Sequence, residues 1–209
     1  FNNAYEAFHK SQLNSKYEKC NKALFRNYIL DYEKNLDNKN FYLKKDSYFK
    51  KKNNVCFLIG FPRSGTTLLD TILRSHPDID VIEEKPIINS LERIIKTQLK
   101  YKLSEIHKLT EPEVENLREY YLEKILKLSD KKNSRIIIDK FPFQTVSLPL
   151  INFIFPEAKI IFAHRHPYDT VLSCFQQCFE PNNAMANLRS LRESSEIYDL
   201  SMKMWVRYK

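Results

Sequence analysis

A short loop, GFPRSGTT at residues 60–67, carries the residue types that bind a phosphate group. An apolar run, then G-x-x-x-x-G, then two threonines that open a helix is the geometry in which backbone N–H groups face an anion. Gly60 and Gly65 are the only two glycines among 209 residues, so we expect them where the backbone needs a positive φ or a close approach to a ligand. A plain strand-to-helix turn is the alternative interpretation.

The loop differs from that of nucleotide triphosphatases at one position. Those enzymes have a lysine after the second glycine, which reaches the β- and γ-phosphates, and a hydroxyl that binds Mg²⁺. Here Thr66 follows Gly65, and the cation of the loop is Arg63. The pattern therefore indicates a donor that has neither a γ-phosphate nor an obligatory metal, unless Arg63 only pairs with a neighbouring carboxylate.

Two further motifs follow the loop, IIDKFPF at 137–143 and RHPYDTVLSCF at 165–175. In this order the three motifs resemble the sulfotransferases that use 3'-phosphoadenosine 5'-phosphosulfate (PAPS). The resemblance is greatest to the branch with tyrosylprotein sulfotransferases and bacterial enzymes that carry tetratricopeptide repeats upstream. It covers about residues 55–209, and residues 1–50 match the last repeat helix and linker more loosely.

The resemblance implies two sites for the donor nucleotide. An arginine at the end of a strand and a serine eight residues later hold the 3'-phosphate in this family, and Arg165 and Ser173 match that spacing. From spacing alone, Ser173 would instead be a serine on a helix surface. The residues that match the family's site for the 5'-phosphosulfate are Arg63, Ser64, Gly65, Thr66 and Thr67.

The resemblance also implies two catalytic residues. Glu84 matches the base that takes the proton from the acceptor hydroxyl, with Glu83 as its structural partner. Lys140 matches the lysine that meets the bridging oxygen of the leaving group and stabilises the developing phosphate charge. The two glutamates could instead be favourable charges at the start of a helix.

Two cysteines and two histidines near the third motif could alternatively form a zinc site. Cys174 and Cys178 could join His164 and His166 as ligands, but VLSCFQQCF has the periodicity of a helix that buries small side chains. We expect no metal. The partners that the resemblance implies are the donor nucleotide and a hydroxyl acceptor, a protein tyrosine or a carbohydrate, and not a nucleic acid.

Three apolar runs predict buried strands, at residues 55–60, 135–139 and 158–165, and helical spacing follows each run. Strands that alternate with helices predict an α/β fold with a P-loop-type parallel sheet flanked by helices. Ligands of such sheets bind at the carboxyl ends of the strands. All three motifs lie there.

The predicted helices between these strands cover residues 66–77, 85–99 and 111–129. The last of them has a capping box, T-x-x-E, made by Thr110 and Glu113. Spacing predicts helix for residues 1–34 too, and this segment resembles the end of a tetratricopeptide repeat array. We expect a linker at 35–53 and the sulfotransferase domain at 54–209, truncated at its C-terminus because family members continue with a further strand and segment.

The composition says less about the function than the motifs do. The net charge of +8 is compatible with a polyanionic or phosphate-rich ligand, and equally with a lysine-rich surface. The four cysteines form no dense framework, and no membrane span or signal peptide is visible. We expect a bacterial cytoplasmic enzyme, or a protein of the Golgi lumen if an upstream anchor has been removed. A P-loop kinase and a non-catalytic nucleotide-binding repeat protein are the rival functions.

Overall fold

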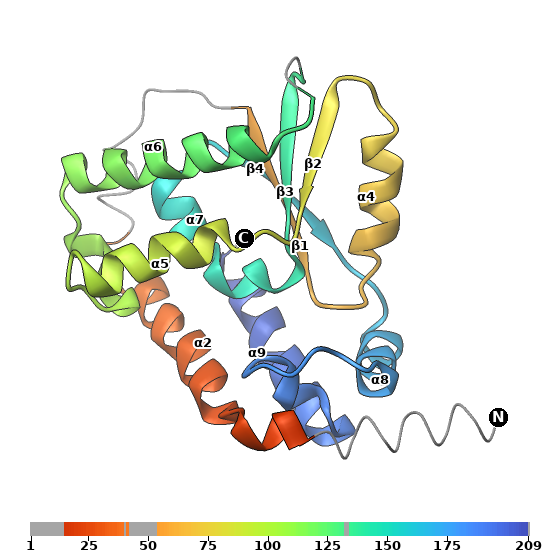
Figure 1. Cartoon of the computed structure of the whole chain (residues 1–209). Coiled ribbons are helices and arrows are strands. Elements are labelled where there is room, and N and C mark those ends of the chain that lie inside the picture. The colour runs from red at the N-terminus through yellow and green to blue at the C-terminus, as the bar shows by residue number, and fades with distance from the viewer. Residues whose placement is uncertain (1–14, 40, 42–53, 132–133, 209) are drawn as a thin grey trace.

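The computed structural model describes residues 15–39, 41, 54–131 and 134–208 (Figure 1). Its centre is a four-stranded sheet in which all paired strands are parallel. Helices cover the sheet on both sides (Figure 1), so the predicted α/β class is confirmed. In spatial order the strands are β2 (Ile79–Glu83), β3 (Ile136–Lys140), β1 (Val55–Gly60) and β4 (Lys159–Ala163).

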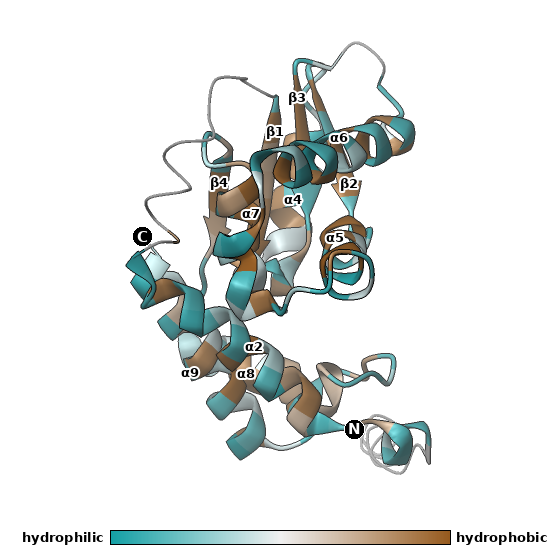
Figure 2. Ribbon diagram, turned by 90° about the vertical axis from the view of Figure 1, so that its left-hand side faces the viewer, coloured by the Kyte–Doolittle hydropathy of each residue, from teal (hydrophilic) through white to brown (hydrophobic). Residues whose placement is uncertain are grey.

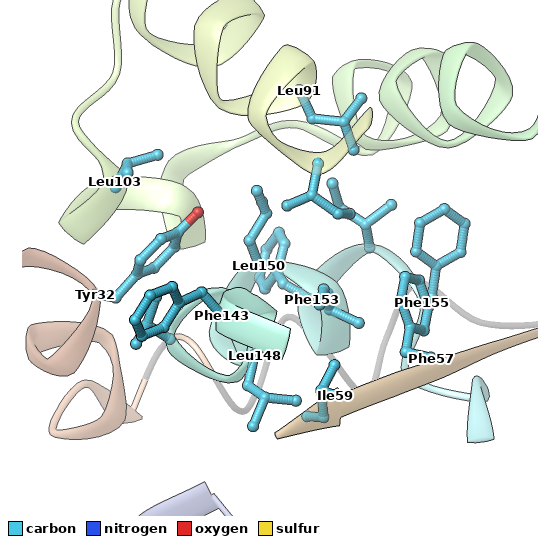
Figure 3. Packing of buried hydrophobic residues seen from close by; sticks show 14 of the residues in the cluster. Tyr32, Phe57, Ile59, Leu91, Leu103, Phe143, Leu148, Leu150, Phe153 and Phe155 are labelled. Atoms are coloured by element: carbon cyan, nitrogen blue, oxygen red, sulfur yellow. The ribbon is translucent and has the colours of Figure 1, made fainter. Parts of the chain in front are cut away.

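Strand β1 is buried along its whole length, as its uninterrupted apolar sequence predicts. Because side chains alternate along a strand, Phe57 and Ile59 point into the main core, whereas Cys56 and Leu58 belong to a smaller cluster under α4. Figure 3 shows Phe57 and Ile59 facing the side chains of α7, with the rings of Phe57 and Phe155 6.0 Å apart. The central strand thus separates two apolar layers.

Helices on the two sides of the sheet differ in number. Helix α4 (Thr66–Arg74) lies on one side, and α5 (Ile87–Thr97), α6 (Glu111–Leu128) and α7 (Leu148–Ile154) lie on the other (Figure 1). The remaining elements are η1 (Ser15–Lys19), α2 (Lys22–Leu36), η2 (Leu103–Lys108), η3 (Pro142–Ser147), α8 (Pro167–Gln176), η4 (Met185–Leu188) and α9 (Leu191–Tyr208).

The capping box predicted for α6 is confirmed. The backbone N–H of Thr110 donates to Glu113 Oε2 at 2.7 Å, and the reciprocal bond from the N3 backbone to the Thr110 side chain is present. Strand β2, in contrast, was not among the predicted strands. Its sequence IDVIE mixes acidic and apolar residues, and Asp80 is buried only because Ser129 Oγ and the Asp130 N–H donate to its carboxylate, at 2.6 and 2.9 Å.

Helix α2 packs against the α/β part of the chain. Ile29 and Tyr32 belong to the main core, and Arg26 forms an ion pair with Glu196 of α9. The helix ends at Leu36, inside the segment predicted as a linker. Residues 40 and 42–53 of that segment lie outside the described residues, and so do residues 1–14 of the predicted helix. The division into repeat remnant, linker and domain stays a prediction.

Figure 2 shows apolar strands enclosed by helices whose polar residues lie outward. Burial of apolar area is the main favourable term in folding, so this layering explains why the strands occupy the centre. None of the helices in the described ranges is both long and apolar enough to cross a membrane.

Candidate active site

The loop between β1 and α4 takes the turn that its glycines predict. Gly65 caps α4 with φ at 97°, a left-handed conformation that costs other residues energy. A Cβ atom on Gly60 would lie 2.6 Å from the carbonyl oxygen of Ala163, so only glycine fits beside β4. Arg63 also has a positive φ, 67°, which is uncommon for a residue with a side chain. Gly65 therefore has the positive φ that was expected, whereas Gly60 is required by its close approach to β4 and not to a ligand.

A cavity of about 320 Å³ opens beside this loop, at the carboxyl ends of the strands. Two candidate residues from outside the loop also line it. Glu84 is the candidate base, and Arg165 is a candidate residue of the donor site. We call this space the loop cavity. The candidate residues that line it are Arg63, Gly65, Thr66, Thr67, Glu84 and Arg165.

Three candidates lie behind this lining. Ser64 is buried, and its Oγ points back over Gly60, where it has no hydrogen-bond partner. Ser173 accepts a hydrogen bond from Arg63 Nε at 3.1 Å. Lys140 is fully buried under Glu84 and Thr67. The structure therefore brings all nine candidates to one end of the sheet, although only six line the cavity.

Lys140 is placed by the register of the sheet. It lies opposite Glu83 in the β2–β3 pair, so the two side chains point to the same face, towards α4. Lys140 Nζ donates to Glu83 Oε1 at 2.9 Å and to Glu84 Oε1 at 2.7 Å, and it lies 3.5 Å from Thr67 Oγ1. The ammonium group is therefore fixed between the loop and the two carboxylates.

Glu83 and Glu84 differ in their charged neighbours and in their access to the loop cavity. The hydrogen bond from Lys140 holds the pKa of Glu83 below its ordinary value, and Arg74 lies 4.0 Å from its other oxygen. Glu83 is thus a structural anion between two cations, and it does not line the loop cavity. Glu84 does line it, at a turn with φ of 49° where its N–H donates to the Lys140 carbonyl at 2.8 Å.

The charge of Lys140 is maintained despite its burial. Burial alone would lower the pKa, but the hydrogen bonds from Nζ to Glu84 and Glu83 outweigh it and raise the pKa above the ordinary value. Lys140 is therefore an ammonium at neutral pH. A fixed cation of this kind can stabilise negative charge that develops on a leaving group.

The arginines of the site differ in how they are held. Arg165 is half exposed, and its Nη2 lies 3.7 Å from Asp169 Oδ2, a weak surface pair on one helix end. Arg63 is exposed apart from its bond to Ser173 on α8. Since neither guanidinium is tied down by a strong pair, both can turn towards an anion in the loop cavity.

Asp139 lies behind the site, on the face of β3 opposite to Lys140. Tyr121 Oη donates to its Oδ2 at 2.7 Å, and the carboxyl group is fully buried. Burial raises its pKa to about 7, although Tyr121 and the nearby Gln144 act in the other direction. The motif DK thus supplies one group to each face of the sheet.

Sequence reasoning missed the apolar wall of the loop cavity. Phe141 and Phe143 stand in the motif IIDKFPF, but the sequence alone predicted a cavity-lining role for neither. Phe179 and Met185 lie beyond α8 in a segment without local periodicity, and no sequence signal marks them. The apolar wall of the loop cavity therefore became visible only in three dimensions.

The cysteines do not gather with the histidines. Cys174 is buried, its Sγ donates to the Pro62 carbonyl at 3.2 Å, and burial raises its pKa to about 12. Cys178 is exposed. Within the part of the chain that the structure describes, no three histidine, cysteine or acidic side chains are grouped so that they could hold a metal ion.

Comparison with known proteins agrees with this geometry. The model of the sulfotransferase family matches residues 56–208. The chain is 35% identical over 130 residues to an uncharacterized protein of Aquifex aeolicus, covering 59% of the chain and 17% of that protein. It is 31% identical over 127 residues to the nodulation protein NoeE of Sinorhizobium fredii, covering 54% and 29%.

A vertebrate enzyme is similar to the same extent. Human protein-tyrosine sulfotransferase 1 is 30% identical over 122 residues, which cover 56% of the chain and 32% of the enzyme. The aligned part of the chain thus spans a third or less of each of these curated relatives.

Proposed function

The chain belongs to the sulfotransferase family, and we propose that it transfers a sulfuryl group from PAPS to the hydroxyl group of an acceptor. The observation that carries this proposal is the loop cavity. It places a phosphate-type loop, two available arginines and one carboxylate around a single space. The buried ammonium of Lys140 lies directly behind that space.

Each charged group has a separate task in the proposed reaction. Glu84 takes the proton of the acceptor hydroxyl as its oxygen attacks sulfur, because it is the glutamate that lines the cavity. The bond between sulfur and the phosphate oxygen breaks, and the electron pair stays on the phosphate. Lys140 and the N–H groups at the start of α4 stabilise that charge.

The donor is distinguished from ATP by where its charges lie. Position 66 holds threonine instead of the lysine that would reach a γ-phosphate, so nothing at this position favours a triphosphate. We assign the 3'-phosphate to Arg165 and Ser173, and the 5'-phosphate to the loop. The bond from Arg63 to Ser173 supports a continuous row of donors between these two positions.

The relatives leave two classes of acceptor open. The human relative is named as an enzyme that acts on protein tyrosine. Either a tyrosine side chain or a sugar presents a hydroxyl that fits beside Glu84 and the aromatic rings of Phe141 and Phe143. We therefore propose a hydroxyl acceptor, protein or carbohydrate.

Calorimetric titration with 3'-phosphoadenosine 5'-phosphate (PAP), the product nucleotide, tests the donor site. We expect PAP to bind at least about tenfold more tightly than 5'-AMP, since a charge-assisted contact contributes about 1.5–3 kcal/mol. Arg165→Ala removes this preference, and Arg63→Ala weakens both nucleotides. Arg192→Ala is the matched control, because Arg192 is exposed on α9, lines neither cavity and pairs with Glu196 one helical turn away.

Three outcomes would contradict the proposal or its assignment of residues. ATP with Mg²⁺ binding more tightly than PAP would favour a P-loop kinase. Binding of PAP with no transfer of sulfate to any hydroxyl compound would favour a non-catalytic nucleotide-binding protein. Loss of PAP preference in Arg192→Ala would show that the arginines act only through the net charge.

A further inference from the structure

A second cavity, of about 440 Å³, adjoins the loop cavity. It is enclosed by helix α2, helix α5, the η3 turn and residues 182–185. Phe141, Phe143 and Met185 line both cavities, so these three side chains form a shared wall. A ligand that places one hydroxyl beside Glu84 can therefore extend into the second cavity.

Aromatic rings form one side of the second cavity. The rings of Phe25 and Phe143 meet edge to face, with centroids 5.1 Å apart, and Phe25 stacks on Tyr28 at 5.8 Å. Such a row of rings offers flat apolar faces on which the C–H groups of a ligand can pack.

Four side-chain amides also line the cavity, those of Asn89, Gln144, Asn182 and Asn183. Backbone N–H groups already donate to the Oδ1 atoms of Asn182 and Asn183, so these two amides offer mainly their N–H groups to a ligand. Asn89 Nδ2 lies 3.4 Å from Glu92 Oε2, so Asn89 offers its Oδ1, and the lining presents both donors and acceptors. Gln144 differs from the other three, because its Nε2 and Oε1 are buried and make no hydrogen bond of normal geometry.

A buried acidic residue in the lining of the second cavity has its hydrogen-bond partners within the protein. Glu92 is buried and accepts hydrogen bonds from Tyr28 Oη at 2.6 Å, Tyr32 Oη at 2.8 Å and Ser147 Oγ at 3.2 Å. Its carboxylate is therefore occupied by the protein. The other charged lining residue among those described is Lys96, which is exposed and lies 5.8 Å from the Tyr28 ring centre.

We propose that the second cavity binds a neutral oligosaccharide, the acceptor whose terminal hydroxyl receives the sulfuryl group. The proposal rests on the proposed function and names its acceptor. A sugar combines hydroxyls, which donate and accept, with C–H faces that pack on aromatic rings, and the cavity offers both complements. An acidic tyrosine peptide would need several cations, whereas Lys96 is the one exposed charge in the described lining.

The experiment uses the full chain saturated with PAP. Maltotetraose, cellotetraose and chitotetraose are titrated calorimetrically, and an acidic peptide with one tyrosine is the comparison. We expect at least one oligosaccharide to bind and to become sulfated when PAPS replaces PAP, and the peptide to bind more weakly.

Two variants locate the binding. Phe25→Ala removes a ring from the wall, and Asn89→Ala removes an exposed amide; each should raise the Kd of the oligosaccharide about tenfold while leaving the Kd of PAP unchanged. Their controls are Leu30→Ala on α2 and Arg93→Ala on α5, exposed residues outside the lining. Lys96→Ala should leave oligosaccharide binding unchanged.

The contrary results are distinct from one another. If PAP binds but no oligosaccharide does, the acceptor proposal fails while the donor assignment stands. If the peptide binds more tightly and loses affinity in Lys96→Ala, the acceptor is an acidic peptide. Oligosaccharide binding that neither Phe25→Ala nor Asn89→Ala weakens would place the ligand elsewhere. Failure of PAP to bind overturns the proposed function and this proposal with it.

Discussion

The loop cavity and the second cavity are built in different ways. Residues 60–67 give the loop cavity most of its chemistry in one turn, and Glu84 and Arg165 each follow the end of a strand. The second cavity takes its lining from α2, α5, η3 and residues 182–185, which are far apart in the chain. The proposed chemistry thus lies where local sequence fixes the geometry, and the proposed acceptor site lies where tertiary packing fixes it.

The charges of the two cavities differ as well. Arg63, Arg165 and Glu84 line the loop cavity with exposed charge. In the second cavity Glu92 is buried and fully hydrogen-bonded, and neutral amides form the rim. A charged site suits a polyanionic donor, whereas a neutral one suits an uncharged acceptor.

The largest expected effect that separates the cavities comes from Lys140→Met. Removing the ammonium takes away the group proposed to stabilise the leaving phosphate, so sulfate transfer should fall about a thousandfold. Binding of neutral oligosaccharide should not change. Initial rates with ³⁵S-labelled PAPS measure the first and calorimetry the second.

Lys85→Met is the matched control for this variant, because Lys85 is the exposed neighbour of Glu84. A transfer rate in Lys140→Met within threefold of the wild-type rate would remove Lys140 from the proposed mechanism. An equal loss in Lys85→Met would point to net charge instead.

Asp139→Asn tests the buried carboxyl group behind the site. The folded pKa, about 7, lies above the ordinary 3.8, so the folded state binds the extra proton. The stabilisation is complete below about pH 4 and is lost as the pH rises to about 7, by at most about 4 kcal/mol. The free energy of unfolding of the wild type should therefore fall relative to Asp139→Asn over this range.

Urea denaturation at pH 4, 5.5 and 7 measures this difference. Asp130→Asn serves as the control, since Asp130 is exposed and should not change the slope. Parallel pH profiles for the wild type and Asp139→Asn would mean that folding does not shift the pKa of Asp139.

The two glycines test how strictly the loop cavity depends on local geometry. Gly60→Ala should lower the free energy of unfolding by about 2–3 kcal/mol, because its Cβ would collide with backbone. Gly65→Ala should lower it by about 1–2 kcal/mol, because it has open space but a φ of 97°. Denaturant titration gives both values, and the reverse order would mean that the backbone dihedral matters more than the close approach to β4.

Tyr32→Phe gives the smallest effect and concerns the second cavity alone. It removes one of the donors to buried Glu92, which should lower the free energy of unfolding by about 1–2 kcal/mol without altering PAP binding. Tyr120→Phe on α6, which is only partly buried, is the control and should change stability by less than about 0.5 kcal/mol. Equal values for the two variants would show that Glu92 does not depend on Tyr32.

The sequence predicted the elements whose signal is local. The apolar run of β1, the glycines of the loop and the capping box of α6 each act within a few residues, and the structure has all three. Strand β2 was not predicted, because Asp80 and Glu83 interrupt its apolar pattern. Hydrogen bonds from Ser129 and Lys140, which are distant in the chain, stabilise these two carboxylates.

The site was predictable to the same degree. Glu84 and Arg165 were found because they stand in motifs that match a family, and the structure brings them to one cavity. The Glu92 network was not predicted, because Tyr28, Glu92 and Ser147 come from three elements with no shared spacing. Long-range side-chain networks of this kind leave no periodic trace in a sequence.

The position of α2 also has a consequence for the order of events during synthesis. Its partners on α9 are made about 170 residues later: Lys22 binds Glu193, and Arg207 binds Glu33 at 2.6 Å. A nascent chain that ends before α9 lacks these ion pairs, although Tyr32 can already donate to Glu92 of α5 and Asn35 to the Leu103 carbonyl. The ion pairs that fix α2 to α9 therefore form late in folding, after the buried side chains of α2 have met their partners on α5 and η2.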